Sequence, residues 1–195
     1  MINLLRFPAA LVLFLVANLA QAEDWPQWRG PNRDGVWRET GTIERFDGPE
    51  IKIKWRVPIS SGYSGPTVAD GRVYVTDRVT DPAEMERVHC VDWKTGTTLW
   101  THRYDCKYGG IGYQAGPRAS VLVDGGRAYS LGTAGHLFCF DAATGKVLWS
   151  HDLRDAYRAR VPTWGIAASP VIEDDLLIVQ CGGADNACVG AFDKL

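Results

Sequence analysis

The sequence predicts an all-β protein built from a repeated unit of four short antiparallel strands. An eleven-residue segment from Cys90 to Trp100 recurs from Cys139 to Trp149, with Cys, Asp, Thr, Gly, Leu and Trp at the same positions. Short runs of β-forming residues are separated by Asp-Gly and Thr-Gly pairs, which favour tight turns. After residue 22, no eleven-residue stretch without Gly or Pro shows the apolar spacing of a helix.

Composition places the chain among ordinary folded proteins. Of its 195 residues, 46% are hydrophobic and 23% are charged, which excludes a disordered chain. The 21 Lys and Arg residues nearly balance the 23 Asp and Glu residues, giving a net charge of −2. Such a balance provides no field to hold a nucleic acid or an anionic membrane surface. The eight Trp residues indicate a repeated structural use of indole rings.

Residues 1–22 have the features of a cleavable export signal. One positive charge lies within Met1 to Arg6, an apolar run extends from Phe7 to Ala17, and Ala20 and Ala22 occupy the positions before a cleavage point. The apolar run is short for a membrane span, which needs roughly 20 residues; a retained N-terminal anchor is the alternative. We therefore expect an exported protein, periplasmic or secreted, with no membrane span after signal removal.

Export would permit disulfides, and five cysteines follow the predicted cleavage point. Because five is odd, at least one thiol stays free. Cys181 and Cys188 flank a short loop that could bring two strand ends within bridging distance, and the pairing of the five is left open. The spacings typical of a zinc site are absent and the four His residues stand singly, so no metal ligands are predicted.

The chain divides into three parts. Residues 1–22 form the signal peptide, and residues 23–58 form an N-terminal segment in which residues 51–57 are expected to supply an outer strand. Residues 59–195 hold the repeats, in which a hairpin block beginning at Gly65, Gly116 and Ser169 precedes each eleven-residue segment or its start. The third segment begins at Ala191 and stops at Leu195. We expect two complete units and a truncated third.

Four short antiparallel strands in a period of about 50 residues are typical of a β-propeller blade. A closed propeller needs about four to eight blades. The sequence is therefore expected to be an N-terminal fragment of a longer protein, and its fold a partial β-propeller.

The eleven-residue pattern resembles the tryptophan-docking motif of the PQQ-like repeats. These repeats occur in eight-bladed quinoprotein alcohol dehydrogenases and in BamB-like proteins of the periplasm. The opening from Asp24 to Gly35 also resembles the start of secreted PQQ-like repeat proteins. The resemblance implies a propeller of seven or eight blades in the full protein. Cys90 and Cys139 stand where the family usually has Ala, which indicates small buried thiols.

The resemblance also implies structural roles for the repeated residues. In the family the motif Trp is buried between neighbouring blades near the Gly of the turn, and its indole N–H finds a carbonyl. The Asp side chain accepts backbone N–H groups of the turn, and Gly takes the left-handed conformation. The docking residues expected here are Trp55, Asp92, Gly96, Trp100, Asp141, Gly145 and Trp149.

Residues that do not recur are the candidates for function. If each blade runs from an inner to an outer strand, the tight turns lie at one end and the longer loops at the other. One of these loops carries Arg158, Arg160 and Trp164, an aromatic and basic mixture suited to a planar or anionic ligand. The expected function is a BamB-like binding or scaffolding role, with protein partners contacted through loops or blade edges.

The alternative function is a PQQ-dependent quinoprotein alcohol dehydrogenase. Under that alternative the cofactors would be PQQ and calcium, and the catalytic residues would lie mostly in further C-terminal blades. No catalytic residue is identified in this sequence, and the cofactor and the enzyme class are left open.

Overall fold

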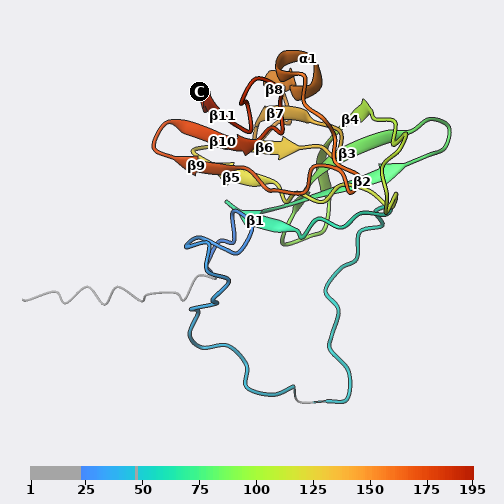
Figure 1. Cartoon of the computed structure of the whole chain (residues 1–195). Coiled ribbons are helices and arrows are strands. Elements are labelled where there is room, and N and C mark those ends of the chain that lie inside the picture. Colours follow the sequence, from blue (N-terminus) through green and yellow to red (C-terminus); the bar gives the residue numbers. More distant parts are fainter. Residues whose placement is uncertain (1–22, 47) are drawn as a thin grey trace, which may run out of the picture.

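The computed structural model describes residues 23–46 and 48–195, so the predicted signal peptide lies outside the described residues. Three antiparallel sheets of four, four and three strands lie side by side (Figure 1). The all-β prediction is therefore confirmed, although the described residues also contain one short helix. The first sheet contains β1 (Thr67–Ala69), β2 (Arg72–Val79), β3 (Met85–Asp92) and β4 (Thr98–Asp105); the second contains β5 (Leu122–Asp124), β6 (Arg127–Leu131), β7 (His136–Asp141) and β8 (Val147–Asp152); the third contains β9 (Val171–Glu173), β10 (Leu176–Gln180) and β11 (Val189–Asp193); and α1 (Leu153–Tyr157) follows β8.

Each sheet is a simple meander in which consecutive strands pair. The repeat in sequence is also a repeat in register. In the first sheet Tyr74 lies opposite Cys90, and Cys90 lies opposite Trp100. In the second sheet Tyr129 lies opposite Cys139, and Cys139 lies opposite Trp149. In both sheets the register shifts immediately after the Cys.

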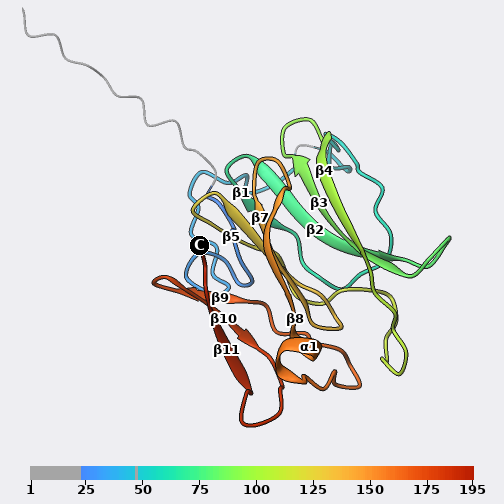
Figure 2. The same cartoon turned by 90° about the horizontal axis from the view of Figure 1, so that it is seen from above.

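The cores lie between the sheets, which fan out when seen from above (Figure 2). Tyr74 and Val88 of the first sheet belong to one buried cluster with Val123 and Phe140 of the second. A second cluster joins the second and third sheets, with Tyr129, Leu137, Cys139, Leu177 and Phe192 among its members. Burial raises the pKa of Cys90 and of Cys139 to about 11, so both thiols stay protonated and pack as small apolar groups.

Trp55 reaches the glycine turn of the first sheet, and Trp100 reaches the equivalent turn of the second sheet. A Cβ on Gly96 would lie 2.9 Å from the Trp55 ring, and one on Gly145 would lie 2.5 Å from the Trp100 ring. Trp55 Nε1 donates to the carbonyl of Trp93 at 3.0 Å, and Trp100 Nε1 donates to the carbonyl of Ala142 at 3.0 Å. Both carbonyls belong to the residue after the motif Asp, so the two contacts are equivalent.

Trp149 occupies the equivalent position in the second sheet and packs against Tyr129 and Phe192. Its indole nitrogen has no hydrogen-bond partner among the described residues. Trp100 and Trp149 are half-buried, not fully buried as expected. The two residues lie on β4 and β8, the last strands of their sheets.

The motif Asp closes the turn that receives the indole. Asp92 Oδ1 accepts the backbone N–H groups of Lys94 and Thr95 and the hydroxyl of Thr95. Asp141 Oδ1 accepts the corresponding groups of Thr144. The hydrogen bonds from the Thr hydroxyls are the largest cause of a lowered pKa at both carboxyl groups. Gly96 and Gly145 follow at φ +74° and +73°, the left-handed region that glycine tolerates.

The outer strand expected at residues 51–57 is not present. These residues form no strand in the structure. An extended segment needs a neighbouring strand to complete its hydrogen bonds, and no strand of the described residues pairs with this one. The segment is held instead through Trp55 and, after it, by a bridge between Ser61 and Arg78.

All five cysteines are free in the structure, and only Cys188 among them is exposed. Cys181 and Cys188 are nevertheless neighbours across the end of the β10–β11 hairpin, because the backbone N–H of Cys181 donates to the carbonyl of Cys188 at 2.9 Å.

Substitution of the docking glycine tests the contact between sheets. Gly145→Ala should destabilise the fold by about 1–3 kcal/mol more than Gly126→Ala, because its Cβ would overlap the Trp100 ring. Gly126 is a matched control, since its φ is +76° and a Cβ there would meet nothing within 4 Å. Urea denaturation followed by fluorescence gives both values. Equal losses would show that the indole contact contributes nothing.

Thiol counting tests the cysteine state. With an excess of an aromatic disulfide reagent, the native protein should titrate one thiol rapidly, that of exposed Cys188, and the denatured protein should titrate all five. A bridge between Cys181 and Cys188 would instead leave no fast thiol and three after denaturation.

Candidate functional site

The tight turns and the longer loops lie at opposite ends of the sheets. The backbone N–H of Trp93 donates to Gly71 and that of Ala142 donates to Gly126, which brings the tight turns of each sheet together at one end. The loops at residues 106–121, 153–170 and 181–188 are joined to one another at the other end. Their links are backbone hydrogen bonds from Gly112 to Thr163, from Arg160 to Gly182 and from Ala184 to Tyr157. We call these three loops the loop end.

Arg118 organises the first of these loops. Its guanidinium donates to the carbonyls of Gly116, Gly112 and Tyr113 at 2.5, 2.7 and 2.6 Å. It also lies 5.3 Å from the centre of the Tyr63 ring. Sequence reasoning missed this residue. A signal was available, because Arg118 follows the Gly-Pro pair at the position where the first repeat has Thr67.

Glu86 is a buried carboxylate that joins the first two sheets. Its side chain accepts the hydroxyls of Tyr104 and Tyr108 and the backbone N–H of Thr133. Burial, followed by the charge of Glu86, raises the pKa of both tyrosines, so they remain protonated donors. Gly132 leaves the room for this contact, because a Cβ there would lie 2.4 Å from the Tyr104 oxygen. All these groups serve one another, and none is left for an external ligand.

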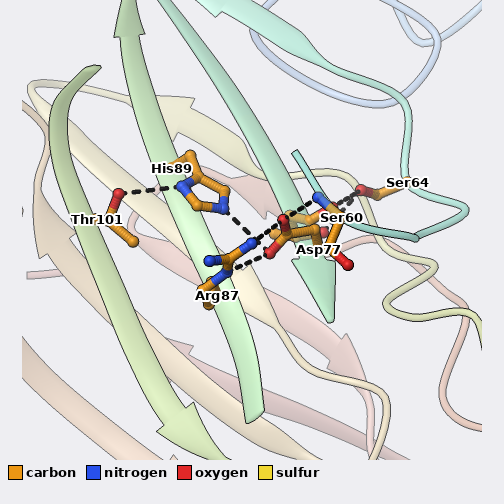
Figure 3. A network of polar contacts seen from close by, with 7 residues as sticks. Ser60, Ser64, Asp77, Arg87, His89 and Thr101 are labelled. Carbon is orange, nitrogen blue, oxygen red and sulfur yellow. Dashed lines mark hydrogen bonds and ion pairs between the residues drawn. The ribbon is translucent and has the colours of Figure 1, made fainter. Parts of the chain in front are cut away.

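Asp77 is the centre of a second polar network, on the first sheet (Figure 3). It is fully buried and is contacted by Arg87 Nε and Nη2 at 2.8 and 2.5 Å, by His89 Nε2 at 3.0 Å and by the backbone N–H of Ser60 at 2.6 Å. His89 Nδ1 lies 3.0 Å from the hydroxyl of Thr101. Burial alone would raise the pKa of Asp77, but the bonds from His89, Arg87 and Ser60 outweigh it and hold the pKa well below its usual range.

The connectivity of Thr101, His89 and Asp77 matches that of a hydroxyl, base and acid relay. In Asp77, however, both carboxylate oxygens are already engaged by Arg87. None of the three residues lines the pocket described next. The network therefore joins β2, β3, β4 and the preceding segment, and we assign it a structural role.

Two of the three predicted ligand-facing residues meet in one pocket. Arg160 and Trp164 line a hollow of about 250 Å³ together with Ile166, Cys181 and Gly182. The Trp164 ring lies 4.8 Å from the Tyr113 ring, centre to centre, and it remains 58% exposed. The pocket thus has an apolar floor, an indole wall and one guanidinium.

Arg158 is not brought into this pocket. It ends α1 in the left-handed conformation, at φ 50°, and forms an ion pair with Asp185 on the neighbouring loop. Both side chains are largely exposed. The sequence grouped Arg158 with Arg160 because they are two residues apart, but the end of the helix turns the first one away.

The described residues show neither a grouped metal-ligand set nor a membrane-spanning helix. Within residues 23–46 and 48–195, no three side chains of His, Cys, Asp or Glu are grouped so that they could hold a metal ion. In the same part of the chain no helix is long and apolar enough to cross a membrane.

Comparison with known proteins gives a consistent result. Residues 84–195 match the family model described as outer membrane protein assembly factor BamB. The chain is 25% identical over 182 residues to the quinohemoprotein alcohol dehydrogenase of Comamonas testosteroni, covering 91% of this chain and 24% of that protein. It is 26% identical over 184 residues to the dehydrogenase subunit of an alcohol dehydrogenase (quinone) from Gluconacetobacter polyoxogenes, covering 87% and 24%.

The crystal structure of the Comamonas testosteroni enzyme superposes with a TM-score of 0.58 at 24% identity, covering 91% of this chain and 26% of that chain. This likeness shows the fold. The chain spans about a quarter of the length of the curated relatives that it matches. The three sheets therefore correspond to part of a propeller.

The described residues do not by themselves fit PQQ with calcium. The pocket offers an indole and a guanidinium, but its lining contains no carboxylate, whereas calcium takes six to eight oxygen ligands.

The lowered pKa of Asp77 gives a prediction for stability. A carboxyl group whose pKa is lower in the folded than in the unfolded state stabilises the fold above about pH 3.9, and this contribution is lost as the pH falls through the folded value. Asp77→Asn should therefore cost about 3 kcal/mol at pH 7, and the gap to the wild type should narrow below pH 4. Denaturation at several pH values measures it, with Asp105→Asn, at an exposed position, as the control. A gap that does not change with pH would contradict the prediction.

Proposed function

This chain belongs to the PQQ-like β-propeller repeat family whose model is described as outer membrane protein assembly factor BamB, and we propose that it acts as a binding module of an exported propeller. Members of this family are typically periplasmic. The signal features of residues 1–22 support export of this chain as well. The proposed binding surface is the loop end.

One observation carries the proposal: the repeated Trp, Asp and Gly residues are used in packing, whereas two large aromatic side chains of the loop end, which do not repeat, remain exposed. Trp55 and Trp100 dock on glycine turns, and Asp92 and Asp141 close those turns. At the loop end, by contrast, Trp164 is 58% and Tyr113 is 68% exposed. Large aromatic rings in water are unfavourable unless something covers them.

The chemistry of the loop end suits a protein partner. Exposed Trp, Tyr and Arg side chains around an apolar hollow are the residue types that dominate binding energy at protein interfaces. The loops are also held rigid by Arg118 and Glu86, so little conformational freedom would be lost on binding. With a net charge of −2, a nucleic acid is not a proposed partner.

A second function is favoured by the curated relatives, both of which are named as alcohol dehydrogenases. Under this proposal the chain would contribute part of the wall of a quinone site, with Trp164 and Arg160 toward the ligand. The calcium ligands and the general base would come from blades beyond this sequence.

Cofactor titration separates the two functions. For the binding module we expect no saturable change in the absorbance of PQQ on addition of protein, with or without calcium. We also expect no alcohol-dependent reduction of an artificial electron acceptor. Stoichiometric PQQ uptake with turnover, both abolished by Trp164→Ala, would overturn the binding module and establish the second function.

Partner capture tests the loop end directly. Arg160→Ala combined with Trp164→Ala should weaken binding of an exported partner at least tenfold, because removing such anchors typically costs about 2 kcal/mol or more. Trp93→Ala is the control, since Trp93 is an exposed indole at the opposite, turn end. Equal effects of both variants would place the binding surface elsewhere.

A further inference from the structure

The N-terminal segment at residues 24–35 crosses the inner edges of all three sheets. Trp25 exchanges backbone hydrogen bonds with Val68 of β1, at 2.8 and 2.9 Å. The carbonyl of Pro26 accepts the N–H of Val123 in β5. Arg33 reaches the carbonyl of Ile172 in β9 and lies 3.6 Å from the carboxylate of Glu173. In Figure 2 this blue segment lies beside the short inner strands, away from the loop at α1.

A pocket of about 270 Å³ lies between this segment and the starts of β1 and β5. Its lining includes Trp25, Gln27, Trp28, Arg29, Thr67 and Ser120. None of these residues is shared with the pocket at the loop end. The proposed function of the loop end does not use this site.

The two aromatic walls of the pocket each lie against a glycine. A Cβ on Gly30 would lie 2.8 Å from the Trp25 ring, so only glycine lets that ring take its position. A Cβ on Gly65 would lie 3.8 Å from the Trp28 ring, which places this second ring against the backbone. Trp28 nevertheless remains 58% exposed. An indole with one face against the protein and the other open is suited to packing against the C–H face of a sugar ring.

The charges around the pocket favour an anion. Arg29 is the only charged residue in its lining, and its Nη2 donates to the carbonyl of Asp34 at 2.9 Å. The neighbouring acids are already engaged: Asp34 pairs with Arg38 at 2.6 Å, and Asp24 accepts the N–H of Asp70 at 3.0 Å. A guanidinium has five N–H donors, so Arg29 retains the capacity to bind a carboxylate.

One of the residues that line the pocket has a hydroxyl without a partner in the described part of the chain. Thr67 is 1% exposed, and its Oγ1 has no hydrogen-bond partner among the described residues. A buried hydroxyl without a partner is unfavourable. A ligand hydroxyl that reached Thr67 would relieve this cost. Gln27, whose Nε2 donates to Pro31, retains its amide oxygen as an acceptor.

We propose that this pocket binds a single-ring sugar acid of the hexuronate class. The sugar ring would stack on Trp28, its carboxylate would pair with Arg29, and its hydroxyls would meet Thr67 and Gln27. A volume below the usual range for drug-sized ligands, about 300–1,000 Å³, suits one ring. A cationic ligand fits poorly, because no carboxylate lines the pocket.

Titration calorimetry of the protein with sodium glucuronate tests the proposal, with glucose and benzoate as comparison probes. We expect glucuronate to bind one site per chain, and glucose and benzoate to bind at least tenfold more weakly. Glucose lacks the carboxylate for Arg29, and benzoate lacks the hydroxyls for Thr67. Equal binding of glucose would show that a carboxylate paired with Arg29 adds nothing to the affinity. Equal binding of benzoate would show that the sugar hydroxyls add nothing to it. Either result, or no heat from glucuronate, would overturn the proposal.

Variants locate the site. Arg29 has φ 67°, so Arg29→Asn is preferred to Ala because Asn tolerates the left-handed region. Arg29→Asn and Trp28→Ala should each weaken glucuronate binding at least tenfold, while Trp37→Ala, an exposed indole outside the pocket, should leave it unchanged. Unaltered binding in both pocket variants would place the sugar acid elsewhere and overturn the proposal.

Matching thermal denaturation midpoints would show that the variants are folded, and a variant with a lower midpoint would be replaced by Trp28→Phe or Arg29→Lys. Trp164→Ala should not affect this binding, so failure here and failure of the loop-end function are distinguishable.

Discussion

The docking of an indole from one sheet onto a glycine turn of the next is the contact on which the arrangement depends. It joins two surfaces that would otherwise remain in water, and it also sets their relative position, because the indole N–H must meet one particular carbonyl. Trp100 meets the carbonyl of Ala142, and the same carbonyl accepts the hydroxyl of Tyr74 at 3.2 Å. The third sheet repeats half of this arrangement, since Tyr129 donates to the carbonyl of Lys194 at 2.9 Å. Two donors from one sheet therefore converge on one acceptor of the next, which fixes distance and rotation together.

A fixed relation between sheets explains why the loops can form one surface. Loops that lie far apart in the sequence meet only if neighbouring sheets keep a fixed position and orientation relative to each other. At the loop end this is secured a second time, because Glu86 of β3 binds Thr133 of the second sheet, and Gly112 binds Thr163. The tight turns thus carry the docking contacts, and the loop end carries residues that differ from one repeat to the next. This division follows from strand order and does not require any special property of the loop residues.

Most of the fold could be predicted from the sequence, but less of the site could. The docking motif is local: its Asp, Thr and Gly lie within a few residues, and the repeat shows them twice. Glu86 was missed because its partners come from distant segments, and nothing in the local sequence marks such a meeting. Arg118 was missed although its place after the second Gly-Pro pair, where the first repeat has Thr67, was a signal. Residues 51–57, which were expected to supply an outer strand, have no pairing strand among the described residues. Alternation of apolar and charged residues predicts an extended segment, but a strand exists only where another strand pairs with it. Arg158 was also misplaced by the local sequence. It takes the left-handed conformation at the end of α1, and this directs it away from Arg160.

The polar groups of the molecule divide into those that are satisfied internally and those that are not. Asp77 and Glu86 are buried and fully engaged, and removing either partner would leave an uncompensated buried group. Arg29, Arg160 and the hydroxyl of Thr67 have unused capacity, and each lines a pocket walled by an exposed indole. An exposed Trp beside a guanidinium with free donors is not part of the docking contacts between the sheets. The two pockets share no lining residue, so binding at one does not use the residues of the other.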